Sequence, residues 1–269
     1  MPVRSPAPWL ERAIASVEGQ TLDNWGLLVL DDGISPEDMA KVRHHRQVRI
    51  EPNPGTGIAT ALAHGVSVSS TPWVARLDAD DIALPERLAT QVSRLKEDPR
   101  LVLLGSWADA FTQSESAPSR TITVPTDPMR AMRLLLSNCF IHPTVLMHRE
   151  ASLAAGNYRA AATGYEDYDL WLRLAAVGGV ANIQCPLVLY RLHTAQSSRA
   201  SMTSSAQRSI RQSRLALARR RQFPRPATLA IDAAWGSLQR YSRPGGGRFS
   251  LRVRKRTLRG FGTHRDGGK

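Results

Sequence analysis

The sequence predicts an α/β fold in which helices flank a mainly parallel sheet. Continuous apolar runs recur along the chain, as in strands that are buried on both faces. Amphipathic helical patterns separate these runs, so that strand and helix alternate. Acidic residues directly follow the apolar runs, at the strand ends where parallel sheets bind their ligands. We therefore expect a ligand site at one edge of the sheet.

The first elements follow from hydrophobic periodicity. Residues 9–20 place three aliphatic side chains on one face, which predicts an amphipathic helix. The run 27–33 ends in two acids and a glycine and predicts a buried parallel strand. Residues 48–51 predict a short strand, and the Gly-rich turn in 53–66 opens an Ala-rich helix.

The pattern continues in the same alternation. Residues 71–81 predict a strand that ends in three acids. Pro85 then begins a helix, because proline suits the first helical turn. Residues 101–111 predict another strand, and residues 163–179 open with three acids and run on as a helix.

The charge of the chain is distributed unevenly. Of its 36 Lys and Arg residues, 17 follow residue 199, against only two acids in the same segment. We therefore expect a folded domain over residues 1–199. Residues 200–269 are expected to form a basic extension that is helical or partly disordered.

The composition predicts a cytoplasmic protein. No apolar stretch approaches the roughly 18 residues that a membrane-spanning helix needs. No signal peptide follows Met1, and two cysteines make no disulfide framework. The basic segments 211–221 and 250–261 could dock on an anionic membrane surface, which would place the protein at the inner face of the membrane.

Three acidic clusters carry the chemistry that the sequence can support: Asp31-Asp32, Asp78-Ala79-Asp80 and Glu166-Asp167. Each cluster alone is often structural, since acids are common in turns and in the first turn of a helix. Unpaired carboxylates repel one another, however, so three acids at the end of a buried strand favour a bound cation.

Taken together and in order, these motifs resemble the family 2 glycosyltransferases. The resemblance extends from Met1 to about His193, and its specific segments are LDADDIALPERL, FIHPTVLMHRE and GYEDYDLWLRLA. It implies the GT-A fold, a Rossmann-like arrangement, and an inverting transfer of a sugar from a nucleotide-diphosphate donor to a hydroxyl acceptor. The acceptor would be a saccharide or lipid-linked molecule in polysaccharide or glycolipid assembly.

The resemblance also implies a role for each motif. Asp167 would be the catalytic base that takes the proton of the acceptor hydroxyl. Mg²⁺ or Mn²⁺ would be held by Asp80 and His193, although His193 could also be a solvated residue at a strand end. The nucleotide sugar would contact Asp31, Asp32, Gly57, Asp78 and Asp80. The acceptor side would include Glu166, Trp107 and His142, with a core position as the alternative for Trp107.

The amino end departs from the family pattern. Members usually begin with a strand of the kind V-S-V-I-I-P, and residues 1–3 match only its last part. Most of a first, central strand is therefore expected to be absent, which would leave rows of backbone groups without partners. A start codon called too late, poor folding, or another segment in the gap would each account for this. We favour the late start.

Two other function classes remain open. The chain could be an inactive, truncated glycosyltransferase homologue. The pI of about 10.9 would also suit a nucleic-acid-binding protein. Against the second class, the basic excess is confined to the last 70 residues and no recognition motif accompanies it. We therefore expect no nucleic-acid partner.

Overall fold

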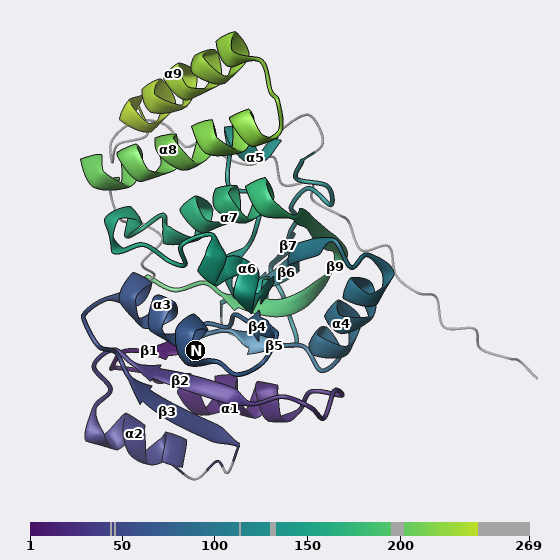
Figure 1. Cartoon of the computed structure of the whole chain (residues 1–269). Helices are drawn as coiled ribbons and strands as arrows, with labels where there is room; N and C mark the ends of the chain where they lie inside the picture. The colour runs from purple at the N-terminus through teal and green to yellow at the C-terminus, as the bar shows by residue number, and fades with distance from the viewer. Residues whose placement is uncertain (44, 46, 113, 130–132, 195–201, 242–269) are drawn as a thin grey trace, which may run out of the picture.

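The computed structural model describes residues 1–269 except 44, 46, 113, 130–132, 195–201 and 242–269 (Figure 1). The expected basic segment 250–261 therefore lies outside the described residues. None of the helices in the described part combines the length and the apolar content needed to cross a membrane.

The amino-terminal part holds a three-stranded parallel sheet in the order β1-β2-β3. Its strands are β1 (Pro2–Val3), β2 (Leu27–Asp31) and β3 (Val48–Pro52). The helices that alternate with them are α1 (Leu10–Glu18), α2 (Pro36–Arg43) and α3 (Ile58–Val68). The parallel sheet and the two helices that the sequence predicts here are thus confirmed.

A second, mixed sheet has the order β4-β8-β6-β9-β5, with β7 paired to β6. The two long strands, β6 and β9, run parallel, and the other pairs are antiparallel. The strands are β4 (Trp73–Ala75), β5 (Ile82–Ala83), β6 (Leu101–Phe111), β7 (Arg120–Ile122), β8 (Leu146–His148) and β9 (Gly179–Arg191). The strand expected over 71–81 is shorter. It ends at Ala75, and the three acids lie in the loop that follows it.

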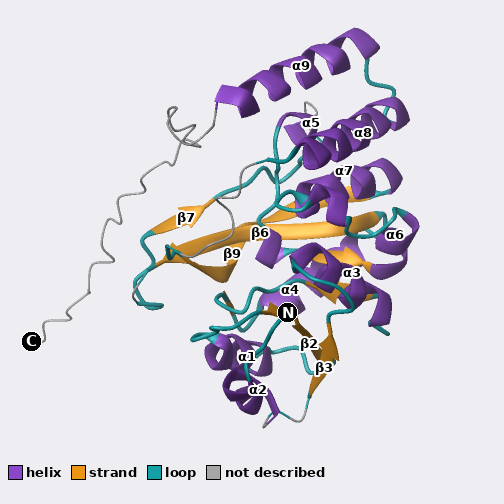
Figure 2. Cartoon of the chain, turned by 90° about the vertical axis from the view of Figure 1, so that its left-hand side faces the viewer, coloured by secondary structure: helices purple, strands orange, loops and turns teal. Residues whose placement is uncertain are grey.

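The remaining helices cover this second sheet. They are α4 (Arg87–Glu97), α5 (Arg133–Leu136), α6 (Arg149–Ala154), α7 (Glu166–Val177), α8 (Ser204–Arg220) and α9 (Arg225–Tyr241). In the views of Figures 1 and 2, α7 lies over the sheet, α8 over α7, and α9 outermost. The helices expected from Pro85 and over 163–179 and 211–221 are present.

Strand β1 is short, as the sequence predicts. It pairs with β2, and the amide of Leu30 donates to the carbonyl of Met1 at 2.9 Å. The amide of Asp32 donates to the carbonyl of Val3 at 2.9 Å. The two sheets share no strand in the described part of the chain. The few residues before Arg4 nevertheless fix the end of β2, where Asp31 and Asp32 lie.

The largest core cluster lies around α7. Trp171 of α7 and Leu103 of β6 are completely buried there. Ile210 and Leu217 of α8 belong to the same cluster. The domain boundary near residue 200 stays a prediction. Apolar residues of α8, which follows this boundary, pack in the same core cluster as those of α7.

Candidate active site

The central acidic cluster lies in the loop between β4 and β5. One carboxylate oxygen from each of Asp78, Asp80 and Asp81 lies within 4.8 Å of the others. Burial, together with the neighbouring carboxylates, raises the pKa of Asp80 and raises that of Asp81 well above its ordinary value. Burial is the largest single effect on Asp78, but the charge and hydrogen bond of Arg76, together with His142 and the N-terminal ammonium, lower the pKa of that carboxyl.

This donor set fits a hard divalent cation. The Oδ2 atom of Asp81 is buried and has no hydrogen-bond partner in the described residues. Burying such an atom without a partner is costly, and repulsion among three carboxylates adds to the cost. Mg²⁺ and Mn²⁺ prefer carboxylate oxygens, so one such ion would offset both penalties.

The end of β9 completes the cluster. The Nε2 atom of His193 lies 2.7 Å from Oδ2 of Asp80, and its ring packs on Trp9 with 4.7 Å between centroids. The backbone amide of Arg191 donates to Oδ1 of Asp81 at 2.8 Å. The structure thus brings together Asp80 and His193, which are 113 residues apart in sequence. The metal-binding role of His193 stays a prediction.

The second acidic cluster opens helix α7. Asn138 donates from its Nδ2 atom to Oδ2 of Asp167 at 2.7 Å. Burial and the neighbouring Glu166 raise the pKa of Asp167 to about 6. Burial likewise raises the pKa of Glu166, which accepts a hydrogen bond from the amide of Gly164 at 2.6 Å. A carboxylate whose pKa approaches neutrality can accept a proton in a reaction near pH 7.

The two clusters share one electrostatic environment. The charges of Arg76 and Asp78 both act on the carboxyl of Glu166. Burial raises the pKa of Tyr158, and the charges of Asp167 and Asp78 act on this phenol together. The charge of Arg76 also acts on His142, whose Nε2 atom lies 3.1 Å from the hydroxyl of Tyr158. The loop after β4 and the start of α7 therefore act on one group of side chains.

His142 and Trp107, expected on the acceptor side, lie in different surroundings. The Nε2 atom of His142 lies 3.1 Å from the hydroxyl of Tyr158. Burial and the charge of Arg76 lower the pKa of His142 to about 3, so its ring is neutral. Trp107 is half-buried on β6 and donates from Nε1 to the carbonyl of Val124 at 2.9 Å. Both acceptor-side roles stay predictions.

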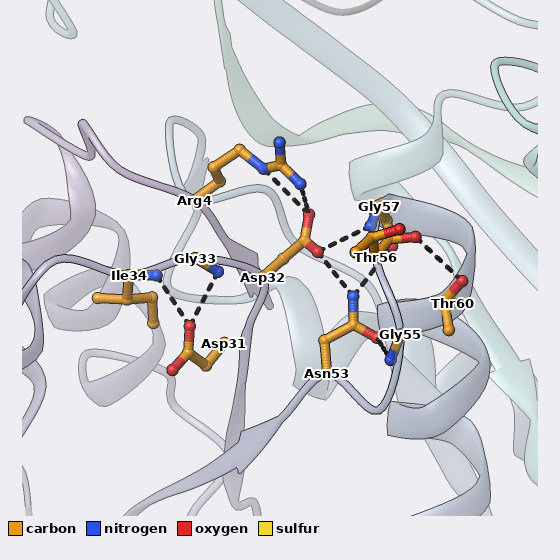
Figure 3. A network of polar contacts seen from close by, with 10 residues as sticks. All are labelled: Arg4, Asp31, Asp32, Gly33, Ile34, Asn53, Gly55, Thr56, Gly57 and Thr60. Carbon is orange, nitrogen blue, oxygen red and sulfur yellow. Dashed lines mark hydrogen bonds and ion pairs between the residues drawn. The ribbon is translucent and has the colours of Figure 1, made fainter.

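In the third cluster, at the end of β2, the two acids have different hydrogen-bond partners (Figure 3). Oδ1 of Asp31 accepts hydrogen bonds from the amides of Gly33 and Ile34, at 2.9 and 2.8 Å, and closes a turn. Asp32 instead connects three segments. Its carboxylate contacts Arg4 at 2.9 Å and, from Oδ1, the Nδ2 atom of Asn53 at 2.6 Å.

Asp32 also reaches the start of helix α3 (Figure 3). The amide of Gly57 donates to its Oδ1 atom at 2.8 Å. Gly57 has φ of 87°, in the left-handed region that favours glycine, and this conformation turns its amide toward the acid. The structure therefore joins Asp32 and Gly57 directly, while Asp31 serves the turn. Their contacts with a nucleotide stay predictions.

Sequence reasoning missed three residues of this region. Arg76 is buried beside Asp78, and a charged residue inside the apolar run VARL was the available signal. Asn138 and Tyr158 are ordinary polar residues in their segments, and no local pattern distinguishes them. Only the folded chain shows that they approach Asp167 and His142.

Acidic residues at the strand ends of an α/β fold are the arrangement expected of a GT-A glycosyltransferase, and similarity to known proteins assigns the chain to this class. Residues 1–154 match the model of the protein family "Glycosyl transferase family 2". The match covers more than half of the chain, so the chain belongs to glycosyl transferase family 2. The predicted family, fold class and enzyme class are confirmed.

Two relatives and one solved structure illustrate the similarity. The chain is 30% identical to the amylovoran biosynthesis glycosyltransferase AmsE of Erwinia amylovora, over 68% of this chain and 70% of AmsE. It is 27% identical to WfgD of Escherichia coli, a UDP-Glc:alpha-D-GlcNAc-diphosphoundecaprenol beta-1,3-glucosyltransferase, over 74% and 77%. The structure of S. aureus TarS 1–349 with UDP-GlcNAc superposes with a TM-score of 0.70 at 11% identity, covering 90% of this chain and 71% of TarS.

Proposed function

We propose that this glycosyltransferase is an inverting, metal-assisted enzyme. It moves a sugar from a nucleotide-diphosphate donor to a hydroxyl acceptor in polysaccharide or glycolipid assembly. The observation that carries the proposal is that the charges of Asp78 and Asp167 both act on Tyr158, whose hydroxyl lies 3.1 Å from Nε2 of His142. The names of AmsE and WfgD support the setting.

On the donor side, Asp80 and His193 would hold Mg²⁺ or Mn²⁺, with Asp78 at the same cluster. When bound, the ion would neutralise charge on the departing diphosphate. Asp32 and the amide of Gly57 lie at the carboxyl end of β2, where nucleotides bind in such sheets. Together with Asp31, they are the proposed contacts of the nucleoside. The donor classes of WfgD and TarS support a nucleotide-diphosphate sugar.

On the acceptor side, Asp167 would accept the proton of the attacking hydroxyl as that oxygen bonds to the anomeric carbon. The bond from this carbon to the nucleoside diphosphate breaks in the same displacement, so the configuration inverts. Asn138 would hold the carboxylate in position through its 2.7 Å hydrogen bond. Glu166 would keep the pKa of Asp167 high enough for proton transfer near neutrality.

The acceptor is proposed to be a saccharide or a lipid-linked molecule. Glu166, Trp107 and His142 are the proposed contacts on its side of the site. The basic segments 211–221 and 250–261 are proposed to approach an anionic membrane surface, where a lipid-linked acceptor would be presented. The diphosphoundecaprenol acceptor in the name of WfgD supports this arrangement.

A thermal-shift panel tests the proposed function. Full-length protein is heated with UDP-, GDP- and dTDP-sugars, each with Mn²⁺ or with EDTA. We expect one class of sugar nucleotide to raise Tm only when Mn²⁺ is present. Transfer or donor hydrolysis with the same sugar nucleotide then separates an active enzyme from an inactive homologue. If no sugar nucleotide changes Tm with Mn²⁺, the proposal is wrong.

A further inference from the structure

A basic cavity lies at the opposite end of β9 from the acidic cluster. Its volume is about 790 Å³, and it is lined by the ends of α4 and α8 and by the first residues of β6 and β9. Gly179 begins β9 in this cavity, whereas Arg191 ends the same strand beside Asp81. At about 3.3 Å per residue, a strand of this length separates the two places by roughly 40 Å. The cavity is therefore distinct from the proposed donor site.

Four arginines from three segments line this cavity: Arg94, Arg100, Arg220 and Arg221. Two acids, Asp98 and Asp127, also line it, so positive charge is in excess. Like charges held together repel one another. The two acids of the lining can balance the charge of only two of the four guanidinium groups.

The arginines use only part of their hydrogen-bonding capacity. Nε and Nη2 of Arg100 donate to the carboxylate of Asp98 at 2.8 and 3.2 Å, and Nη1 of Arg94 lies 3.7 Å from Oε2 of Glu97. Such exposed ion pairs contribute little stability. The side chain of Arg220 has no hydrogen-bond or ion-pair partner among the described residues. Each guanidinium carries five N–H donors, so most donors here face solvent or the cavity.

Arg221 shows that one wall of the cavity is fixed. Its Nε and Nη2 atoms donate to the carbonyl of Ala175, at 3.1 and 2.8 Å, and Nη2 also donates to Gly178 at 2.8 Å. These bonds hold the guanidinium at the end of α7 and leave Nη1 available. The cavity also exposes an apolar side chain, Val177, with 57% of its surface accessible.

We propose that this cavity binds a phosphate ester through the guanidinium groups of Arg94, Arg100, Arg220 and Arg221. Guanidinium groups match phosphate oxygens in geometry and charge, and several of them around one cavity suit a multiply charged anion. Val177 would contact an apolar part of the ligand next to its phosphate. The inference does not depend on the proposed transfer reaction, because no residue of the acidic clusters takes part.

Calorimetric titration of the full-length chain with inorganic pyrophosphate tests the proposal. EDTA is present throughout, so that no metal recruits pyrophosphate to the acidic cluster. The double substitution Arg94→Gln with Arg220→Gln removes two charges that are not needed to fix α7. We expect it to weaken pyrophosphate binding by about tenfold or more, since each charge-assisted hydrogen bond lost costs affinity.

The matched control substitutes Lys96→Gln and Arg208→Gln. Both residues are exposed on the same two helices, α4 and α8, and neither lines the cavity. The control keeps the same net charge as the cavity variant, and we expect its affinity to stay within about twofold of the unsubstituted chain. Equal losses in both variants, unchanged binding in the cavity variant, or no binding of pyrophosphate by the unsubstituted chain would each overturn the proposal.

Vesicles containing phosphatidylglycerol identify the source of the phosphate. If the cavity variant loses both pyrophosphate binding and vesicle pelleting while the control keeps both, the ligand is a lipid headgroup. If it loses pyrophosphate binding and still pellets with vesicles as the control does, the ligand is a free phosphate ester. Either result supports the shared chemistry of the cavity.

Discussion

The carboxylates around Asp80 and the carboxyl of Asp167 differ in what stabilises their negative charge. Around Asp80 and Asp81, burial and neighbouring carboxylates make a negative charge costly, and Oδ2 of Asp81 has no partner in the described residues. Burial and the neighbouring Glu166 raise the pKa of Asp167 to about 6, while the hydrogen bond from Asn138 favours its charged form. The first cluster suits a cation, and the second suits reversible proton transfer.

Asp167→Asn tests the proposed base. The amide has nearly the same shape but cannot accept the proton, so we expect turnover to fall by roughly 10²- to 10⁴-fold. Donor binding, followed by the Tm increase with sugar nucleotide and Mn²⁺, should be unchanged. Near-normal turnover in this variant would mean that another group accepts the proton.

The pH dependence of kcat/KM tests the surroundings of Asp167. The base acts when deprotonated, so the rate should fall as pH drops through its pKa of about 6. Glu166→Gln removes a negative charge that raises this pKa, so the acidic limb should move to lower pH. Asn138→Ala removes a hydrogen bond that lowers it, so the limb should move to higher pH. Shifts in the same direction for both variants would contradict the assignment.

At the scale of elements, α8 is attached to α7 by buried polar contacts as well as apolar ones. Oγ of Ser213 donates to Oδ1 of Asp169 at 2.6 Å, and Nη2 of Arg173 donates to Oδ2 at 2.7 Å. Arg214 is completely buried and donates from Nε to the carbonyl of Leu135 at 2.9 Å. The third acid of GYEDYDL therefore anchors a neighbouring helix.

Ser213→Ala tests this attachment. It leaves Oδ1 of the fully buried Asp169 without its hydroxyl donor, so we expect the free energy of unfolding to fall by about 1–3 kcal/mol. Urea denaturation measures the change. The control is Ser204→Ala in the exposed first turn of α8, which should stay within about 0.5 kcal/mol. Equal effects would show that the Ser213 contact adds no stability.

Strand β9 is an element whose full length could not be predicted from the sequence. The sequence predicts an apolar strand before His193, but the structure extends it back to Gly179. Pro186 interrupts the pattern, and the pairing with β6 shifts register at this place, where a bulge can accommodate proline. Alternating apolar runs and helices were predictable because each depends on local periodicity.

Side-chain partnerships in the site were predictable only in part. The three acidic clusters could be located because they follow strands or open a helix, and such ends converge. The contact between Asn138 and Asp167 joins residues 29 positions apart, and no local pattern specifies it. The different contacts of Asp31 and Asp32 likewise depend on where Gly57 and Arg4 lie in the fold.

At the scale of the whole molecule, the described part of the basic extension belongs to the folded unit. Ile210, Leu217 and Trp235 contribute to the core around α7, although the local composition is strongly basic. Net charge therefore describes the surface of this segment, while its helical periodicity determines what it buries.

Two truncations test this organisation. A chain ending at residue 241 retains α8 and α9 and should unfold cooperatively with nearly the Tm of the full chain. A chain ending at residue 199 exposes the face of α7 that Leu217 covers and should lose the cooperative transition. Cooperative unfolding of the shorter chain at an unchanged Tm would establish an independent domain that ends near residue 200.

The central claim is that a divalent cation occupies the cluster around Asp80, and Mn²⁺ titration followed by electron paramagnetic resonance in the presence of UDP tests it most directly. The chain and its Asp23→Ala control, altered at an exposed acid, should each bind one Mn²⁺. Asp80→Asn, checked for an unchanged circular dichroism spectrum, should lose that ion. Equal Mn²⁺ affinity in the chain with and without the Asp80 carboxylate would contradict the account.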